Sequence, residues 1–244
     1  MRSPYNLLAC CYDALMAEVP YSRWINFISA FAKPGDKIID VGCGTGTVTC
    51  ALALKGYQVV GLDPSPEMLS AARFKADQLG LSVNWLQQRF VQLNLRADMI
   101  ISTCDGINHI LNLRELVHFF RRAFRCLNPG GCLIFDFNTE FKYRRLLASG
   151  TFAWEIPGLN VVWQNNYSTP YNRAVIMLYK RQAPDIYAKS TLEIVQRCYP
   201  LSSLVYYLRQ SGFSKISVWN NYKGKLKSTR VPRITVVAHK IKES

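Results

Sequence analysis

Residues 38–46 read IIDVGCGTG, an apolar run that ends in Asp40 and then presents Gly42, Gly44 and Gly46. The apolar run predicts a buried strand, and the glycines predict a tight turn directly after it. Glycines at alternate positions let the backbone bend sharply and approach a ligand without interference from a Cβ atom. In open α/β sheets such loops lie at the carboxyl ends of the strands, where ligands bind. The segment therefore predicts a ligand-binding loop in an α/β fold.

The spacing of the glycines and two acidic residues indicate the kind of ligand. A dinucleotide-binding loop would read G-x-G-x-x-G and would seat a pyrophosphate on a helix N-terminus. Here the pattern is G-x-G-x-G with Asp40 two positions before it, which suits a ligand with a positively charged amino-acid tail and no phosphate. Asp63 ends the run VVGLD, 23 residues after Asp40, and can accept hydrogen bonds from both hydroxyls of a ribose. The alternative for Asp63 is a cap for the helix expected to begin near Pro66.

Around this loop, short apolar runs alternate with segments of helical periodicity, which predicts βαβ units and a parallel sheet. The expected strands are residues 37–41, 57–62, 83–86, 99–103 and 132–137, and the expected helices are residues 47–54, 66–79 and 113–127. The Asn-Pro-Gly-Gly segment at 128–131 predicts a turn. Residues 152–199 are rich in β-branched and aromatic residues and predict three or four antiparallel strands. A helix at 201–210 and strands at 215–222 and 233–239 are expected to follow.

Composition and charge restrict the class of protein and its partners. The chain has 244 residues, 49% of them hydrophobic and 19% charged, which is typical of a globular domain and excludes a disordered chain. The formal net charge is +14, and all of the excess lies in residues 121–244, which hold twenty Lys and Arg against six Asp and Glu. This asymmetry indicates either an anionic partner (RNA, an acidic lipid surface or an acidic small substrate) or a basic face that only maintains solubility.

The cysteines and the apolar runs predict the cellular compartment. Eight cysteines show no C-x-x-C pair and no metal-ligand spacing, so we expect reduced thiols in a cytoplasmic protein and no metal site. The apolar runs are too short for a transmembrane helix, and the first residues lack the layout of a secretory signal, so stable membrane insertion is not expected. Nothing in the sequence specifies an oligomeric state.

Five segments in this order and spacing resemble the class I S-adenosylmethionine-dependent methyltransferases: IIDVGCGTG, VVGLDPSPEML, ADMII, LNPGG and LIFDFNT. The resemblance covers roughly residues 36–140 and implies a Rossmann-like, doubly wound, seven-stranded and mostly parallel sheet with helices on both faces. Its last strand would run antiparallel. The methyl donor would be S-adenosyl-L-methionine, released as S-adenosyl-L-homocysteine. Residues 1–244 would form one methyltransferase domain, with a helical lid similar to that of the small-molecule branch (1–30), a cofactor-binding core (36–140), an antiparallel insertion for the substrate after the fifth strand (150–200) and a terminal helix and strand pair (201–244).

The resemblance also implies which residues meet the cofactor. Contacts are expected from the lid, the glycine loop and the ends of the second and fourth strands: Tyr12, Asp40, Gly42, Cys43, Gly44, Gly46, Asp63, Pro64 and Cys104. Asp40 and the loop would lie at the methionine moiety, and Asp63 at the ribose. Met68 would either cover the adenine ring or fill the core. The family usually has an acidic residue near the adenine amino group, whereas Arg89 stands there in this chain, and Gln88 is expected to offer an acceptor instead.

By the same resemblance, the loop at 104–109 faces the donor methyl group. Methyl transfer from a sulfonium ion is an in-line displacement, in which positioning and desolvation of the nucleophile can supply most of the catalysis. A general base helps only if the nucleophile arrives protonated, and the candidates are His109 and Asp105. A helix cap or a core position is the alternative for His109.

Three functions remain open on the sequence. The first is methylation of a small molecule at N, O or C, and an anionic acceptor would be compatible with the basic half of the chain. The second is methylation of RNA, motivated by the same charge and by residues 223–233. Base amino groups are disfavoured, because TCDGIN stands where the family's enzymes for that reaction carry an Asn/Asp-Pro-Pro-aromatic motif. The third is a non-catalytic binding protein that keeps the fold, motivated by Arg89.

Overall fold

A computed structural model describes residues 4–148 and 150–241. Residues 1–3 of the expected lid and residues 242–244 of the expected domain lie outside the described residues. None of the described helices combines the length and the apolar character needed to cross a membrane.

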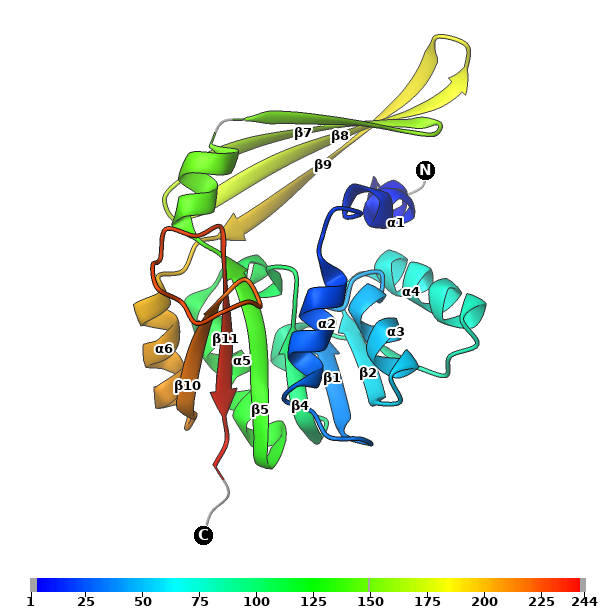
Figure 1. Cartoon of the computed structure of the whole chain (residues 1–244). Coiled ribbons are helices and arrows are strands. Elements are labelled where there is room, and N and C mark those ends of the chain that lie inside the picture. Colours follow the sequence, from blue (N-terminus) through cyan, green and yellow to red (C-terminus); the bar gives the residue numbers. More distant parts are fainter. Residues whose placement is uncertain (1–3, 149, 242–244) are drawn as a thin grey trace.

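A seven-stranded sheet forms the centre of the described structure, in the order β10-β11-β5-β4-β1-β2-β3 (Figure 1). Its strands are β1 (Lys37–Val41), β2 (Gln58–Asp63), β3 (Asn84–Gln87), β4 (Ala97–Ser102), β5 (Leu127–Asn138), β10 (Ser214–Asn220) and β11 (Arg233–His239). Strands β1 to β5 run parallel, whereas β11 runs antiparallel to both β5 and β10. The predicted fold class, including the antiparallel last strand, is confirmed.

Helices cover both faces of this sheet because both faces of its strands are apolar. The helices are α2 (Tyr21–Ser29), α3 (Thr47–Leu54), α4 (Pro66–Gln78), α5 (Leu113–Cys126) and α6 (Leu201–Gln210). Side chains alternate along a strand, so Ile38 of β1 packs with Trp24 of α2 and Leu52 of α3. Its neighbour Ile39 belongs to the cluster on the other face, which contains Phe119 of α5. Burial on both faces is what a parallel sheet requires.

The insertion after β5 forms a sheet of its own. Its four antiparallel strands are β6 (Thr151–Ile156), β7 (Leu159–Ser168), β8 (Tyr171–Ala183) and β9 (Ile186–Arg197). They pair in the order β6-β7-β8-β9 as a separate sheet, and the antiparallel strands expected within residues 152–199 are confirmed. A short π-helix, η3 (Lys142–Leu147), leads from β5 into this sheet, which lies beyond the carboxyl ends of the core strands (Figure 1).

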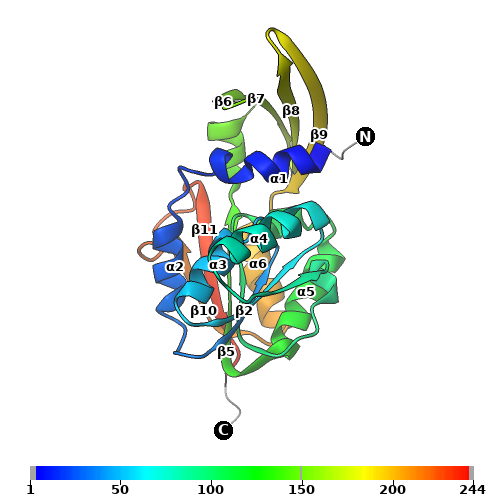
Figure 2. The same ribbon diagram turned by 90° about the vertical axis from the view of Figure 1, so that its right-hand side faces the viewer.

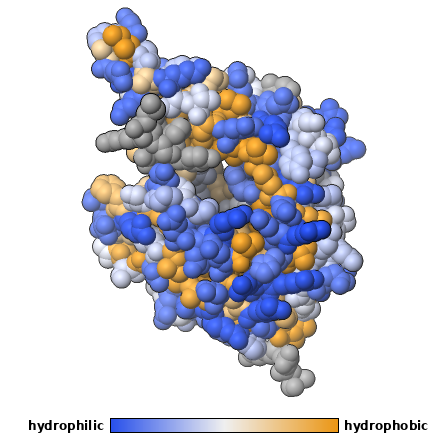
Figure 3. Space-filling view, turned by 180° about the vertical axis from the view of Figure 1, so that it is seen from behind, coloured by the Kyte–Doolittle hydropathy of each residue, from blue (hydrophilic) through white to orange (hydrophobic). Residues whose placement is uncertain are grey.

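The first helix, α1 (Pro4–Leu15), lies between the insertion sheet and helices α3 and α4 (Figure 2). Leu8 and Cys11 of α1 pack against Val161, Ile176 and Leu192 of the insertion. The apolar face of α1 is therefore covered by the insertion rather than by the core sheet. Seen from behind, the surface is hollowed beneath the insertion sheet (Figure 3).

One local prediction is wrong. The segment at 128–131, expected to be a turn, belongs to β5, which begins at Leu127. The C-terminal segment holds it in place: the Gly130 N–H donates to the Lys240 carbonyl, and the Lys240 N–H donates to the Gly131 carbonyl, both at 2.9 Å. The register of β5 against β4 shifts between Ala97 and Met99, so the four residues are an irregularity within a strand.

Candidate functional site

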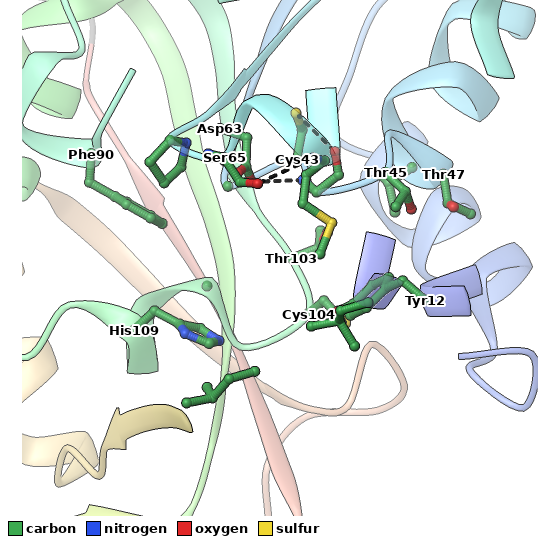
Figure 4. Close-up of a pocket in the computed structure, with 18 of the residues that line it drawn as sticks. Tyr12, Cys43, Thr45, Thr47, Asp63, Ser65, Phe90, Thr103, Cys104 and His109 are labelled. Atoms are coloured by element: carbon green, nitrogen blue, oxygen red, sulfur yellow. Dashed lines mark hydrogen bonds between the residues drawn. The ribbon is translucent and has the colours of Figure 1, made fainter. Parts of the chain in front are cut away.

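A cavity of about 350 Å³ lies where the core strands end, with the glycine loop on one side and α1 and the insertion on the other (Figure 4). The glycine loop and the end of β2 form one wall, and residues after β4 form another. Tyr12 of α1 and Ile194 of β9 belong to the roof. Nine of the expected site residues line it: Tyr12, Gly42, Cys43, Gly44, Asp63, Pro64, Met68, Cys104 and His109.

The glycine loop bends back over the end of β2. The N–H groups of Gly42 and Cys43 both donate to the Leu62 carbonyl, at 2.7 and 3.0 Å. Gly42, Gly44 and Gly46 have positive φ angles of 77°, 55° and 75°, a conformation that side chains strain. A Cβ atom on Gly44 would meet no atom within 4 Å, because this residue faces the open cavity. The loop therefore offers bare backbone to a ligand.

Gly46 has a different task from Gly44. It does not line the cavity, and it is the N-cap residue of α3. A Cβ atom there would lie 2.6 Å from the Trp85 ring and 3.0 Å from the Ala72 side chain. Gly46 thus allows α3 to pack closely against β3 and α4.

Asp63 holds the loop to the end of β2. Its carboxylate accepts hydrogen bonds from the N–H groups of Gly44 and Ser65, each at 2.9 Å. Burial raises the pKa of this carboxyl, and the two N–H donors partly offset the effect. The cap of α4 is Ser65, whose hydroxyl accepts from the Met68 N–H at 3.2 Å, so the alternative of Asp63 as that cap is excluded. Its carboxylate instead belongs to the cavity wall.

Asp40 is completely buried and does not line the cavity. One carboxylate oxygen accepts a hydrogen bond from the Thr49 hydroxyl at 2.6 Å, while the other has no partner within the described structure. Burial raises the pKa of Asp40 to about 7. A buried acceptor without a donor is unfavourable, so Asp40 would be stabilised by a cationic group brought close by a ligand.

The residues after β3 include Arg89, which stands where the family usually has an acidic residue. Its guanidinium forms an exposed ion pair with Glu115 at 3.0 Å and does not line the cavity. Gln88 does not line the cavity either, although its side-chain oxygen is buried without a partner in the described residues. Phe90 takes a place in the wall instead, which the sequence reasoning missed. A lone aromatic residue beyond a short strand gives no signal that separates a cavity wall from the core.

The loop after β4 is held in a strained shape by a buried ion network. Cys104 and Asp105 have positive φ angles of 57° and 56°, and their N–H groups donate to the carboxylate of Asp136 in β5, at 2.9 and 2.7 Å. Arg233 of β11 forms ion pairs with both Asp136 and Asp105. Burial opposes ionisation of Asp105, but the positive charges of Arg233 and Lys142 and the hydrogen bond from Arg233 act together against it, and the net effect lowers the pKa of Asp105. Asp105 does not line the cavity, so its charge positions the loop.

His109 reaches the cavity from the 3-10 turn η2 (Gly106–His109). It is exposed, so a core position is excluded. The side-chain nitrogen of Gln196 lies 3.1 Å from His109 Nε2 and donates to Asp105 at 2.5 Å. An amide nitrogen can only donate, so His109 Nε2 is the acceptor in this contact. Gln196 comes from β9 and was not singled out from the sequence, because nothing local connects the insertion with residue 109.

Comparisons with known proteins agree with this fold. A family profile described as "Methyltransferase domain" matches residues 38–131. The putative methyltransferase YqeM of Bacillus subtilis is 33% identical over 164 residues, which are 66% of this chain and 66% of that protein. The putative methyltransferase GWCH70_2453 of Geobacillus sp. is 27% identical over 97% of this chain and 99% of its own length.

Among solved structures, an S-adenosylmethionine-dependent methyltransferase from Clostridium acetobutylicum superimposes with a TM-score of 0.85 at 27% identity. The match covers 99% of this chain and 100% of that one. The chain belongs to the class I S-adenosylmethionine-dependent methyltransferases, whose methyl donor is S-adenosylmethionine.

Proposed function

We propose that this protein transfers the methyl group of S-adenosylmethionine to a small-molecule acceptor. The observation that carries the proposal is that bare backbone at Gly44 lines the same cavity as Asp63, Cys104 and His109. In Figure 4 Asp63 lies on one side of this cavity, and Cys104 and His109 lie on the other. The side with Gly44 and Asp63 offers hydrogen-bonding groups to a nucleoside with an amino-acid tail. The side with Cys104 and His109 offers room for the methyl acceptor.

The residues present fit the donor at three points. Asp63 can accept from ribose hydroxyls, as acidic residues do at the end of the second strand in nucleoside-binding folds. Phe90 and Met68 offer apolar surface to a flat ring. The unpartnered oxygen of Asp40 would gain from a nearby ammonium group. Bound there, the donor supplies an electrophilic methyl group.

The chain's own residues would exclude water and take up a proton. Tyr12 and Ile194 cover the cavity and so desolvate a nucleophile inside it. His109 Nε2 accepts from the Gln196 amide, and an acceptor that displaces this amide can deliver its proton to the same nitrogen. Burial raises the pKa of Cys104 to about 12, so this residue stays a neutral thiol and does not compete for the methyl group.

The shape of the site supports a small acceptor over a polymer. Residues of α1 and β9 line the cavity together with the glycine loop, and this narrows the space beside the loop that an acceptor can occupy. A ubiquinone biosynthesis O-methyltransferase of Azorhizobium caulinodans is 31% identical over a match that covers 41% of this chain and 39% of that enzyme. The sugar N-methyltransferase KedS8 has the same fold, with a TM-score of 0.74 at 16% identity.

Two measurements test the proposal. Calorimetric titration with S-adenosylhomocysteine should show saturable binding, and a thermal shift should accompany it. Release of S-adenosylhomocysteine from the donor is then followed with small amines, phenols and hydroxy acids on one side and purified RNA on the other. Release driven by RNA alone would contradict a small acceptor. No heat and no thermal shift at roughly millimolar donor would contradict the enzyme itself.

A further inference from the structure

A second and larger cavity, of about 1020 Å³, lies between the start of the insertion and α6. It shares no lining residue with the donor cavity. Four segments that are distant in the sequence build it: η3, the β7–β8 turn, α6 and the loop before β11, which lies beside η3 (Figure 1). Tyr143 stacks on Tyr167 of this cavity, and its hydroxyl donates a buried hydrogen bond of 3.3 Å to Gln196. The amide of Gln196 in turn lies 3.1 Å from His109 of the donor cavity.

The lining of the second cavity is strongly basic. Four arginines line it, Arg144, Arg145, Arg209 and Arg230, and among the described lining residues Glu140 is the one carboxylate. Glu140 pairs with Arg144 at 2.6 Å. None of the ion pairs within residues 4–148 and 150–241 engages the other three arginines. Three guanidinium groups are thus available for an anion, and their planar forks suit phosphate oxygens.

Aromatic rings accompany these arginines. Tyr206 of α6 lines the cavity and is 56% exposed. Tyr167 also lines it, and its ring is fixed from behind by stacking on Tyr143, with centroids 5.5 Å apart and planes inclined by 9°. An exposed ring beside positive charge can bind a flat ligand ring by stacking. Phosphate recognition and ring recognition are therefore available in one hollow.

We propose that this cavity is a second ligand site, which binds a phosphate ester that carries a flat ring, with a nucleoside diphosphate as the representative of the class. A volume of this size is at the upper end of small-molecule pockets, roughly 300–1,000 Å³, and is too large for a single phosphate ion. The site gives a structural role to part of the positive charge of the second half of the chain. It does not depend on the proposed function, because none of its residues belongs to the donor cavity.

The test is calorimetric titration of the full chain with metal-free ADP at low salt, with S-adenosylhomocysteine in excess to fill the donor cavity. Adenosine and inorganic pyrophosphate are titrated separately. ADP should bind more tightly than either, because only ADP combines ring and phosphate. The double variant Arg209→Ala/Arg230→Ala should lose at least about tenfold in ADP affinity. Arg121→Ala, an exposed arginine of α5 outside both cavities, is the matched control and should bind ADP like the parent.

A third variant tests recognition of the ring separately from recognition of the phosphates. Tyr206→Leu should weaken ADP binding severalfold and leave pyrophosphate binding unchanged, since Tyr206 contributes a ring and no charge. The proposal is overturned if ADP does not bind, or if Arg121→Ala loses as much affinity as the double variant. It is also overturned if the double variant binds ADP as tightly as the parent. RNA binding with a salt dependence of several phosphates, without ADP binding, would assign the arginines to a polymer instead.

Discussion

The carboxylate of Asp13 in α1 lies 2.7 Å from the ammonium group of Lys75 in α4. The same carboxylate accepts hydrogen bonds from the hydroxyls of Thr45 and Thr47, at 2.6 and 3.2 Å. Thr45 lies within the glycine loop, between Gly44 and Gly46, and lines the donor cavity, as does Tyr12, the neighbour of Asp13. One side chain thus fastens the lid to the loop and to the helix that together enclose the cavity.

Replacement of Asp13 by Asn should loosen the lid. Asn keeps an acceptor for one threonine but loses the ion pair, so we expect S-adenosylhomocysteine to dissociate about two- to tenfold faster. Stopped-flow displacement of the bound ligand measures the rate. Glu18→Gln, which removes an exposed carboxylate at the end of the same segment, is the control and should leave the rate unchanged. Equal rates in Asp13→Asn and the parent would show that α1 is held by its apolar face alone.

Replacement of Asp63 by Ala should weaken donor binding. The loss of hydrogen bonds to a charged group costs about 1–3 kcal/mol, which corresponds to roughly 5- to 150-fold in affinity. Calorimetric titration with S-adenosylhomocysteine gives the affinity directly. Asp77→Ala, an exposed carboxylate of α4, should bind like the parent. Unchanged affinity in Asp63→Ala would remove Asp63 from the ribose contact.

Alanine at Gly44 and at Gly46 should have unequal effects. Both residues have positive φ, so each substitution carries a backbone cost of about 1 kcal/mol. Only Gly46→Ala also places a Cβ atom 2.6 Å from Trp85, and overpacking of this kind adds about 1–3 kcal/mol. Urea denaturation should therefore rank Gly46→Ala as the less stable variant. Equal destabilisation of the two variants would mean that the Trp85 ring yields without cost.

Removal of Arg233 should destabilise the fold. Arg233→Met leaves Asp136 and Asp105 without their buried cation, and breaking a buried pair costs about 3–5 kcal/mol. Urea denaturation at neutral pH measures the loss, with the exposed Arg230→Met as control. The folded-state pKa of Asp105 is lowered, so this stabilisation is present above the unfolded pKa of about 3.9 and is lost as the pH falls through the folded value. Arg233→Met should accordingly be less sensitive to acid than the parent.

Asp40 should give the opposite dependence on pH. Its folded-state pKa is raised to about 7, so between about pH 4 and pH 7 the unfolded chain loses a proton that the folded protein keeps. The stability contributed by Asp40 therefore falls across this range, by at most about 1.4 kcal/mol per pH unit, and is level above it. Asp40→Asn should become more stable relative to the parent from pH 5 to pH 7. A stability difference that does not change with pH would contradict this.

The fold could be predicted from the sequence where a pattern of neighbouring residues determines the element. The apolar run before the glycine loop and the alternation of strands and helices suffice for the order of the core elements, and the helix at 201–210 was predicted with the observed bounds. The prediction fails where the structure of a segment depends on a pairing partner that is distant in the sequence. The segment at 128–131 becomes part of β5 because Lys240 pairs with it, and no local pattern announces that contact.

Some residues of the candidate site can likewise be recognised from the sequence, and others cannot. The glycine loop and Asp63 are recognisable from spacing, and the structure places both at the cavity. Gln196 and Arg233 are not recognisable, because they reach residues 105 and 109 from β9 and β11, about 90 and 130 positions away along the chain. Arg233 counts as one more positive charge in the composition, whereas in the fold it is a buried cation between two carboxylates.

The insertion sheet has a consequence for how such proteins diversify. The chain leaves the central sheet once, after β5, and returns once, before α6. The family profile ends at residue 131, before this excursion begins. A chimera could therefore keep residues 38–131 and receive a foreign roof between Asn138 and Leu201 with two splice points. Such a graft would keep the glycine loop unchanged while the cavity residues of β9 are exchanged, and the foreign roof would also have to cover the apolar face of α1.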